Sequence, residues 1–184
     1  MPESEAALTA SAQQDEPVSS SQSGADDPVI ELRGVEKHYQ MGSFVVKALR
    51  GVDLKIFPGD YMSILGPSGC GKSTMLNILG CLDQPSVGEY LLDGVDVAQL
   101  PDDHLSSVRG KKLGFIFQSY NLIQQLTVLE NIEVPLYYQG FTEKESREIS
   151  VPLAEKVGLG ARSDHKPTEL SGGQQQRVAI ARAL

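Results

Sequence analysis

One eight-residue run constrains the fold of this 184-residue chain more than any other. Gly66-Pro67-Ser68-Gly69-Cys70-Gly71-Lys72-Ser73 fits the Walker A pattern at every fixed position. It follows the short apolar run 62–65, which predicts a strand, and it leads into a helix predicted over 73–79. A strand, a glycine-rich loop and a helix in this order indicate a phosphate-binding loop.

Each part of this loop has a chemical reason. Glycines let successive backbone N–H groups turn inward around a phosphate, and the helix start behind them adds a favourable dipole. The ammonium of Lys72 supplies a point charge to the terminal phosphates, and the hydroxyl of Ser73 suits Mg²⁺, which prefers hard oxygen ligands. The residues assigned to nucleotide binding are Gly66, Ser68, Gly69, Cys70, Gly71, Lys72, Ser73 and Thr74.

A chance glycine-rich turn is the alternative to this assignment. The four fixed positions match by chance in only about one such chain in a hundred. The pattern therefore predicts that the chain binds a nucleoside triphosphate with Mg²⁺. It does not by itself separate an ATPase from a GTPase or a kinase.

Charge is unevenly spread along the chain. Six of the 24 acidic residues lie in residues 1–28, which contain no Lys or Arg and have no periodic apolar face. We expect a disordered acidic leader there, because such a segment cannot bury enough apolar surface to offset its ordering entropy. The remaining 18 acids nearly balance the 16 bases. This balance gives no support for a nucleic-acid groove, which needs clustered Lys and Arg, so we expect no nucleic-acid partner.

The sequence also predicts a cytosolic chain. The leader lacks the basic start and the apolar stretch of a secretory signal, and no later run reaches the 18 or more apolar residues of a membrane span. Cys70 and Cys81 form no disulfide framework.

The rest of the sequence has patterns that predict strands followed by helices. Turn residues separate the strand-like runs, and Asp93-Gly94 predicts a tight hairpin. Two capping boxes start at Thr127 and Thr142, and Pro152 is expected to kink the second of these helices. Strands are predicted at 29–32, 44–46, 52–56, 62–65, 89–92, 95–97 and 113–117, and a short helix at 102–109.

A second motif, Leu170-Ser171-Gly172-Gly173-Gln174, lies about a hundred residues after the loop and is followed by Gln175-Gln176-Arg177. Ser171 is a good helix N-cap, and two glycines before an apolar helix explain the run structurally. The same geometry would present a hydroxyl and bare N–H groups at a helix start, which suits an anion. Spacing alone leaves both interpretations open.

Together the two motifs resemble the ATP-binding cassette (ABC) family of transporter ATPases, over essentially all of residues 29–184. The runs 77–83, 114–118 and 131–135 are most similar to the macrolide-export and lipoprotein-release subfamily, the MacB and LolD type. The resemblance implies an α/β fold: a P-loop NTPase (RecA-like) core with an N-terminal antiparallel β subdomain and an α-helical subdomain. The implied divisions are a β subdomain and P-loop core over 29–118, a helical subdomain over 119–170 and a signature helix over 171–184.

The resemblance also implies roles for further residues. In this family two nucleotide domains enclose two ATP molecules head to tail, so Ser171, Gly172, Gly173 and Gln174 would act in trans on the ATP of a partner copy. Tyr39 resembles the aromatic residue that stacks on adenine, although it also fits a partly exposed turn tyrosine. Gln118 resembles the glutamine that reaches Mg²⁺ and the attacking water, although it also fits a polar strand end. With Lys72, Gln118 is the candidate catalytic residue.

In this family an apolar strand ending in Asp-Glu and a later His follow the signature, and no such segment occurs in the 184 residues. From the resemblance we expect an incomplete nucleotide-binding domain that lacks the C-terminal part of the core sheet, the Walker B Asp, the catalytic Glu and the switch His. Loss of a general base typically costs about 10²- to 10⁴-fold in rate, so the chain alone is expected to hydrolyse little ATP.

The function implied is that of the ATP-binding subunit of an ABC transporter. It would work as a homodimer of nucleotide-binding domains on the cytoplasmic face of the inner membrane, with a separate permease, ATP and Mg²⁺. Two alternatives remain: a non-hydrolytic ATP-binding or interaction module, and a soluble ABC ATPase without a transport role.

Overall fold

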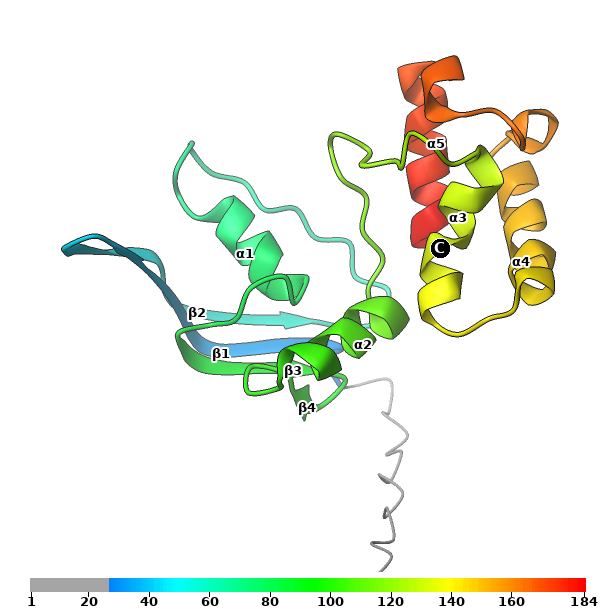
Figure 1. Cartoon of the computed structure of the whole chain (residues 1–184). Coiled ribbons are helices and arrows are strands. Elements are labelled where there is room, and N and C mark those ends of the chain that lie inside the picture. Colours follow the sequence, from blue (N-terminus) through cyan, green and yellow to red (C-terminus); the bar gives the residue numbers. More distant parts are fainter. Residues whose placement is uncertain (1–26) are drawn as a thin grey trace, which may run out of the picture.

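The computed structural model describes residues 27–184, so the prediction of a disordered leader falls almost wholly outside the described part of the chain. These residues form two halves (Figure 1). One half, here the sheet lobe, holds a four-stranded sheet with helices α1 and α2. The other, here the helical lobe, holds helices α3, α4 and α5. Within residues 27–184, none of the helices combines the length and the apolar composition of a membrane span.

The sheet is antiparallel throughout, in the order β2-β1-β3-β4. Its strands are β1 (Ile30–Met41), β2 (Phe44–Ile56), β3 (Val87–Leu92) and β4 (Val95–Asp96). Asp93 and Gly94 have φ of 49° and 78° in the hairpin between β3 and β4, as the Asp-Gly pair predicts. The predicted N-terminal antiparallel subdomain is therefore present, with longer strands than the sequence pattern indicated.

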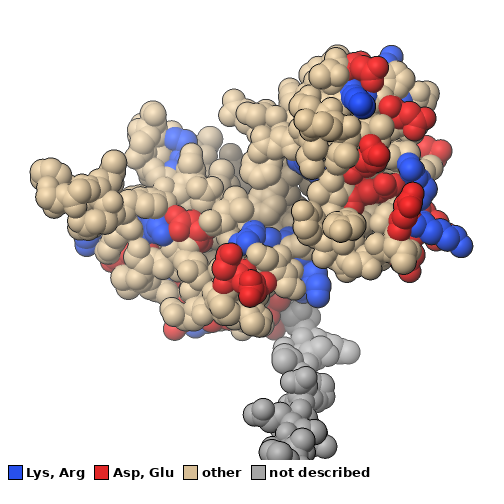
Figure 2. Space-filling view, in the orientation of Figure 1, with Lys and Arg blue, Asp and Glu red and all other residues tan. Residues whose placement is uncertain are grey.

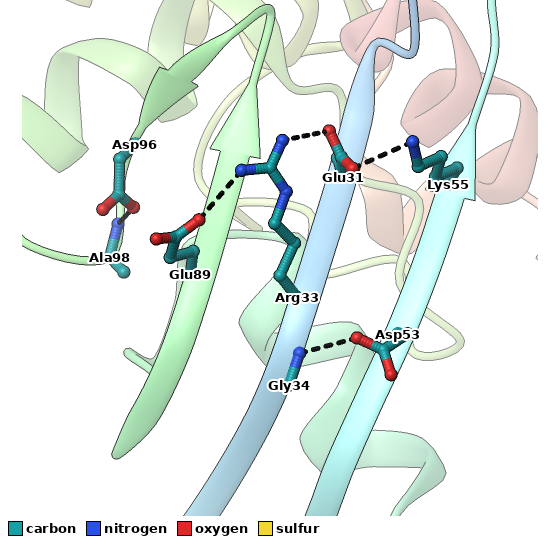
Figure 3. A network of polar contacts seen from close by, with 8 residues as sticks. All are labelled: Glu31, Arg33, Gly34, Asp53, Lys55, Glu89, Asp96 and Ala98. Carbon is teal, nitrogen blue, oxygen red and sulfur yellow. Dashed lines mark hydrogen bonds and ion pairs between the residues drawn. The ribbon is translucent and has the colours of Figure 1, made fainter.

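Opposite faces of the sheet differ in polarity. Glu31 and Arg33, two residues apart on β1, lie on one face, where Arg33 pairs with Glu31 at 3.0 Å and with Glu89 at 3.1 Å (Figure 3). Lys55 on β2 pairs with the other oxygen of Glu31 at 3.0 Å. Leu32, between them, faces the opposite way and is buried. This alternation fixes the register and leaves the apolar face for the helices.

Helices α1 (Lys72–Leu79) and α2 (Asp102–Lys112) belong to this apolar core. The hydroxyl of Tyr90 on β3 donates a hydrogen bond of 2.7 Å to the carbonyl of Leu79, at the end of α1. Arg109 of α2 donates to the carbonyl of Cys81 at 2.7 Å. The C-terminal end of α1 is thereby fixed to both the sheet and α2. The buried side chains of this core are Leu32, Val35, Leu49, Met75, Ile78, Cys81, Tyr90, Leu92, Val97, Ala98 and Leu105.

The helical lobe has a separate core shared by α3 (Val128–Tyr138), α4 (Glu143–Lys156) and α5 (Gly172–Ala183). Short 3₁₀ turns at Gly160–Arg162 and Pro167–Glu169 connect α4 to α5. Both predicted capping boxes are present, at the starts of α3 and α4. Helix α4 runs unbroken through Pro152, and the kink expected there stays a prediction.

Two predicted strands are wrong: residues 62–65 and 113–117 are extended but belong to no sheet. A strand needs a neighbour for its backbone hydrogen bonds, and no described strand lies beside either segment. Segment 113–117 instead borders a cavity of about 1130 Å³, whose other walls come from the ends of α2, α3 and α5 and from α4. Phe115 and Phe117 stack at 5.7 Å, as alternate residues of an extended chain can.

The segment 113–121 connects the two lobes through close contacts. A Cβ atom at Gly80, the C-cap of α1, would lie 2.6 Å from the ring of Phe115. One at Gly114 would lie 2.2 Å from the carbonyl oxygen of Ala183, at the end of α5. Arg182 of α5 donates to the carbonyls of Tyr120 at 2.8 Å and Asn121 at 2.6 Å. The connection therefore depends on glycines at two close contacts, one with an aromatic ring and one with another backbone.

We predict that Gly114→Ala lowers the free energy of unfolding by about 1–3 kcal/mol, because its methyl group overlaps a backbone oxygen that cannot rotate away. Gly110→Ala, in α2, is the matched control, since a Cβ there meets nothing within 4 Å and alanine favours a helix. Urea unfolding of both variants measures the effect. Equal stability of the two variants would contradict the close contact.

Candidate nucleotide-binding site

The phosphate loop lies between β2 and α1, with its helix start at Gly71. Gly69 and Gly71 have φ of 80° and 96°, in the left-handed region that favours glycine. A Cβ at Gly71 would lie 2.7 Å from the carbonyl oxygen of Ala48, so the loop packs directly on the backbone of β2. The glycine at this position is therefore required by both its conformation and its contact.

The loop has the donors that a phosphate needs. Among residues 27–184, none accepts a hydrogen bond from the backbone N–H groups of Lys72, Ser73 or Thr74, which open α1. The Lys72 ammonium donates to the carbonyls of Gly66 at 2.8 Å and Pro67 at 2.7 Å, and its Nζ is 3.8 Å from Cys70 Sγ. Ser73 and Cys70 are exposed. Unpaired N–H groups, a cation and an exposed hydroxyl in one loop fit a triphosphate with Mg²⁺.

Tyr39 lies near the end of β1 and is half-buried. Its hydroxyl donates a hydrogen bond of 2.8 Å to Asp83 and interacts with the side chain of Thr74. Burial, followed by the hydrogen bond to Asp83, raises the pKa of Tyr39, so the hydroxyl stays protonated at neutral pH. The structure thus brings Tyr39 and Thr74 of the phosphate loop together.

Gln118 follows the extended segment 113–117 and is exposed in a turn. The hydrogen bonds of the described residues do not join its side chain to the phosphate loop. Its segment reaches α1 through Phe115 and Gly80, as described above. Gln118 is therefore linked to the loop through the chain and not by a direct bond, and its role stays a prediction.

The second motif forms the start of α5. Ser171 is the N-cap, its hydroxyl accepts from the N–H of Gln174 at 3.4 Å, and the Gln174 side chain accepts from the N–H of Ser171 at 2.8 Å. Ser171, Gly172 and Gly173 are exposed, and a Cβ at Gly173 would meet nothing within 4 Å. The helix start lies apart from the phosphate loop, although both lie on the upper side in Figure 1.

Three features of the described residues bear on alternative sites. Among residues 27–184, no group of three or more His, Cys, Asp or Glu side chains is placed to hold a metal ion. On the face shown in Figure 2, acidic and basic side chains are scattered among uncharged ones, and no broad basic surface is visible. The cavity beside segment 113–117 contains no phosphate-loop residue.

Sequence reasoning missed Lys37 and Asp83, which contact Tyr39. Lys37 is two residues from Tyr39 on β1. Because side chains alternate between the two faces of a strand, the sequence could have placed both residues on one face. No local pattern marks Asp83, which lies 44 residues away in sequence.

The sequence model of the ABC transporter family matches residues 49–184. An uncharacterized ABC transporter ATP-binding protein of Thermotoga maritima is 54% identical over 156 residues, which are 85% of this chain and 67% of that protein. The macrolide export ATP-binding/permease protein MacB of Marinobacter nauticus is 50% identical over 157 residues, which cover 24% of its length.

Among solved structures, the ATP-binding cassette MJ0796, in a dimeric post-hydrolysis state bound to ADP and Pi, is 48% identical with a TM-score of 0.76. The match covers 84% of this chain and 68% of that one. The chain thus spans about two thirds of its single-cassette relatives and about a quarter of the MacB proteins. By sequence, fold and both motifs, the chain belongs to the ABC transporter family.

Proposed function

We propose that this chain is the ATP-binding subunit of an ABC transporter, coupling ATP binding and hydrolysis to substrate movement by a separate membrane permease. The observation that carries the proposal is the presence of a formed phosphate loop and an exposed signature helix start in one chain of this family. Hydrolysis of the terminal phosphoanhydride bond of MgATP would supply the free energy for this movement.

Within this proposal each part of the site has one task. The N–H groups of residues 66–74 bind the phosphates, and Lys72 neutralises their charge and that of the transition state. Ser73 and Gln118 hold Mg²⁺ by their side-chain oxygens, and Tyr39 stacks on the adenine. Among residues 27–184 we assign no general base.

We further propose that Ser171, Gly172, Gly173 and Gln174 act on the ATP of a second copy. Two observations support this: the motif is exposed, and it lies apart from the phosphate loop of its own chain (Figure 1). The MJ0796 cassette is described as dimeric. A two-fold dimer makes each contact twice, so one copy's loop meeting the partner's signature forms two equivalent sites.

The partner on the membrane is proposed from the relatives. MacB proteins are named as ATP-binding/permease proteins, so an ATP-binding domain of this type occurs joined to a permease. Co-purification of a multi-span membrane protein with the full-length protein distinguishes a transporter subunit from a soluble ABC ATPase. ATP hydrolysis by the full-length protein distinguishes it from a non-hydrolytic module.

We predict that Lys72→Met weakens MgATP binding by the full-length protein at least about tenfold, because a charge-assisted contact to the phosphates is lost. Calorimetric titration measures the affinity. Lys144→Met is the control, since the Lys144 side chain is 88% exposed on α4 and far from the loop in sequence. Equal MgATP affinities of the Lys72 variant and the unmodified protein would show that the loop does not bind the nucleotide.

We predict that two inactive variants restore activity when mixed. A Lys72→Met copy and a Gly173→Asp copy together form one site with an intact phosphate loop and an intact signature, if the signature acts in trans. We expect Gly173→Asp to leave its own fold intact, because a Cβ there meets nothing within 4 Å and the position is exposed. ATP hydrolysis by the mixed full-length proteins should exceed that of either variant alone. If the mixture is as inactive as its components, the signature does not act on the ATP of the partner copy.

A further inference from the structure

A polar cluster joins Tyr39 to the two residues that sequence reasoning missed. The Asp83 carboxylate accepts from Tyr39 at 2.8 Å with one oxygen and from Lys37 at 2.5 Å with the other. Lys37 also donates to the carbonyl of Gln84 at 2.8 Å, and the N–H of Gln84 donates to Asp83 at 2.8 Å. Each polar group of the cluster therefore has a defined partner.

This cluster is partly shielded from solvent, and its Lys37 side chain is more buried than its Asp83 side chain. The side chains of Lys37 and Asp83 are 13% and 28% exposed. Removal of one member of such a pair leaves the other charge without compensation, so its geometry is strongly specified. Burial alone would raise the pKa of Asp83, but the hydrogen bonds from Lys37 and Tyr39 outweigh it and lower that pKa. The carboxylate is ionised at neutral pH and accepts both bonds.

The cluster also fixes the ring of Tyr39 in two respects. The Lys37 ammonium lies over one face of the ring, 5.1 Å from its centroid, so a base that stacks on the ring would have to use the opposite face. Asp83 is fixed to α1, since its N–H donates to the carbonyl of Asn77 at 3.2 Å and the N–H of Leu82 to the same carbonyl at 2.8 Å. The ring is therefore held relative to the helix that begins in the phosphate loop.

We propose that Asp83 and Lys37 are positioning residues that hold the ring of Tyr39 for stacking on the nucleotide base, with the base on the face away from Lys37. The proposal rests on the function proposed above for Tyr39. A ring held in advance loses less entropy when the base binds, so the pair raises affinity for the base part of the nucleotide. It leaves the phosphate contacts unchanged, because those belong to the loop.

The test compares MgATP with inorganic tripolyphosphate plus Mg²⁺, a probe without a base, on the full-length protein. Tyr39→Phe keeps the ring and removes the contacts of the hydroxyl with Asp83 and Thr74, whereas Asp83→Asn leaves the hydroxyl in place and removes the charge of its partner. Each should weaken MgATP binding about threefold to tenfold, in line with the loss of one hydrogen bond, and leave tripolyphosphate binding within about twofold. Glu31→Gln, which alters an ion pair elsewhere on β1, is the control and should change neither.

A double-mutant cycle separates positioning from a general structural effect. Tyr39→Ala should remove the advantage of MgATP over tripolyphosphate, and Asp83→Asn should then cost nothing further in MgATP affinity. The inference is overturned if Asp83→Asn weakens both probes equally, or if it still weakens MgATP binding in the Tyr39→Ala background. It is also overturned if Tyr39→Ala weakens MgATP binding while Asp83→Asn and Tyr39→Phe do not. Failure of the unmodified protein to bind MgATP overturns the proposed function and this inference together.

Discussion

The candidate site depends on close contact between two backbones. A side chain at Gly71 would place its Cβ 2.7 Å from the carbonyl of Ala48 and 3.2 Å from the side chain of Leu49, both on β2. The start of α1 can therefore lie against the sheet only because this residue has no Cβ. Tyr39, on the strand paired with β2, reaches Thr74 because the helix lies this close.

The backbone of the loop itself determines where the Lys72 charge lies. Its ammonium is held by the carbonyls of Gly66 and Pro67, inside the loop and away from acidic side chains. A phosphate would exchange these neutral acceptors for charged ones, and hydrogen bonds between charged partners are roughly twice as strong as neutral ones. The loop therefore keeps its cation in place without an ion pair that a nucleotide would have to break.

Local patterns were sufficient for part of the fold. Asp93-Gly94 gave the correct hairpin, and Thr127 and Thr142 gave the correct helix starts, because each feature is determined by residues within four positions. The apolar runs at 62–65 and 113–117 predict strands, and both predictions are wrong. A strand also needs a neighbouring strand to pair with, and a local sequence pattern does not show whether one is present. From the sequence we predict nucleotide contacts for residues 66–74 and Tyr39, and these stay predictions, whereas the contact of Tyr39 with Asp83 arises only when the chain folds.

The two motifs belong to different hydrophobic cores, and this gives the segment between them its importance. The phosphate loop is fixed to the core of the sheet lobe, whereas α5 is fixed to the core of the helical lobe through Val178, Ala179 and Ala181. Segment 113–121, which carries Gln118, contacts the C-terminal end of α1 through Phe115 and contacts α5 through Gly114, Tyr120 and Asn121. Gln139 of the helical lobe also donates to the carbonyl of Gly110 in α2, at 2.7 Å. Because packed cores move as units, any change in the angle between the lobes must change the contacts of the segment in which Gln118 lies.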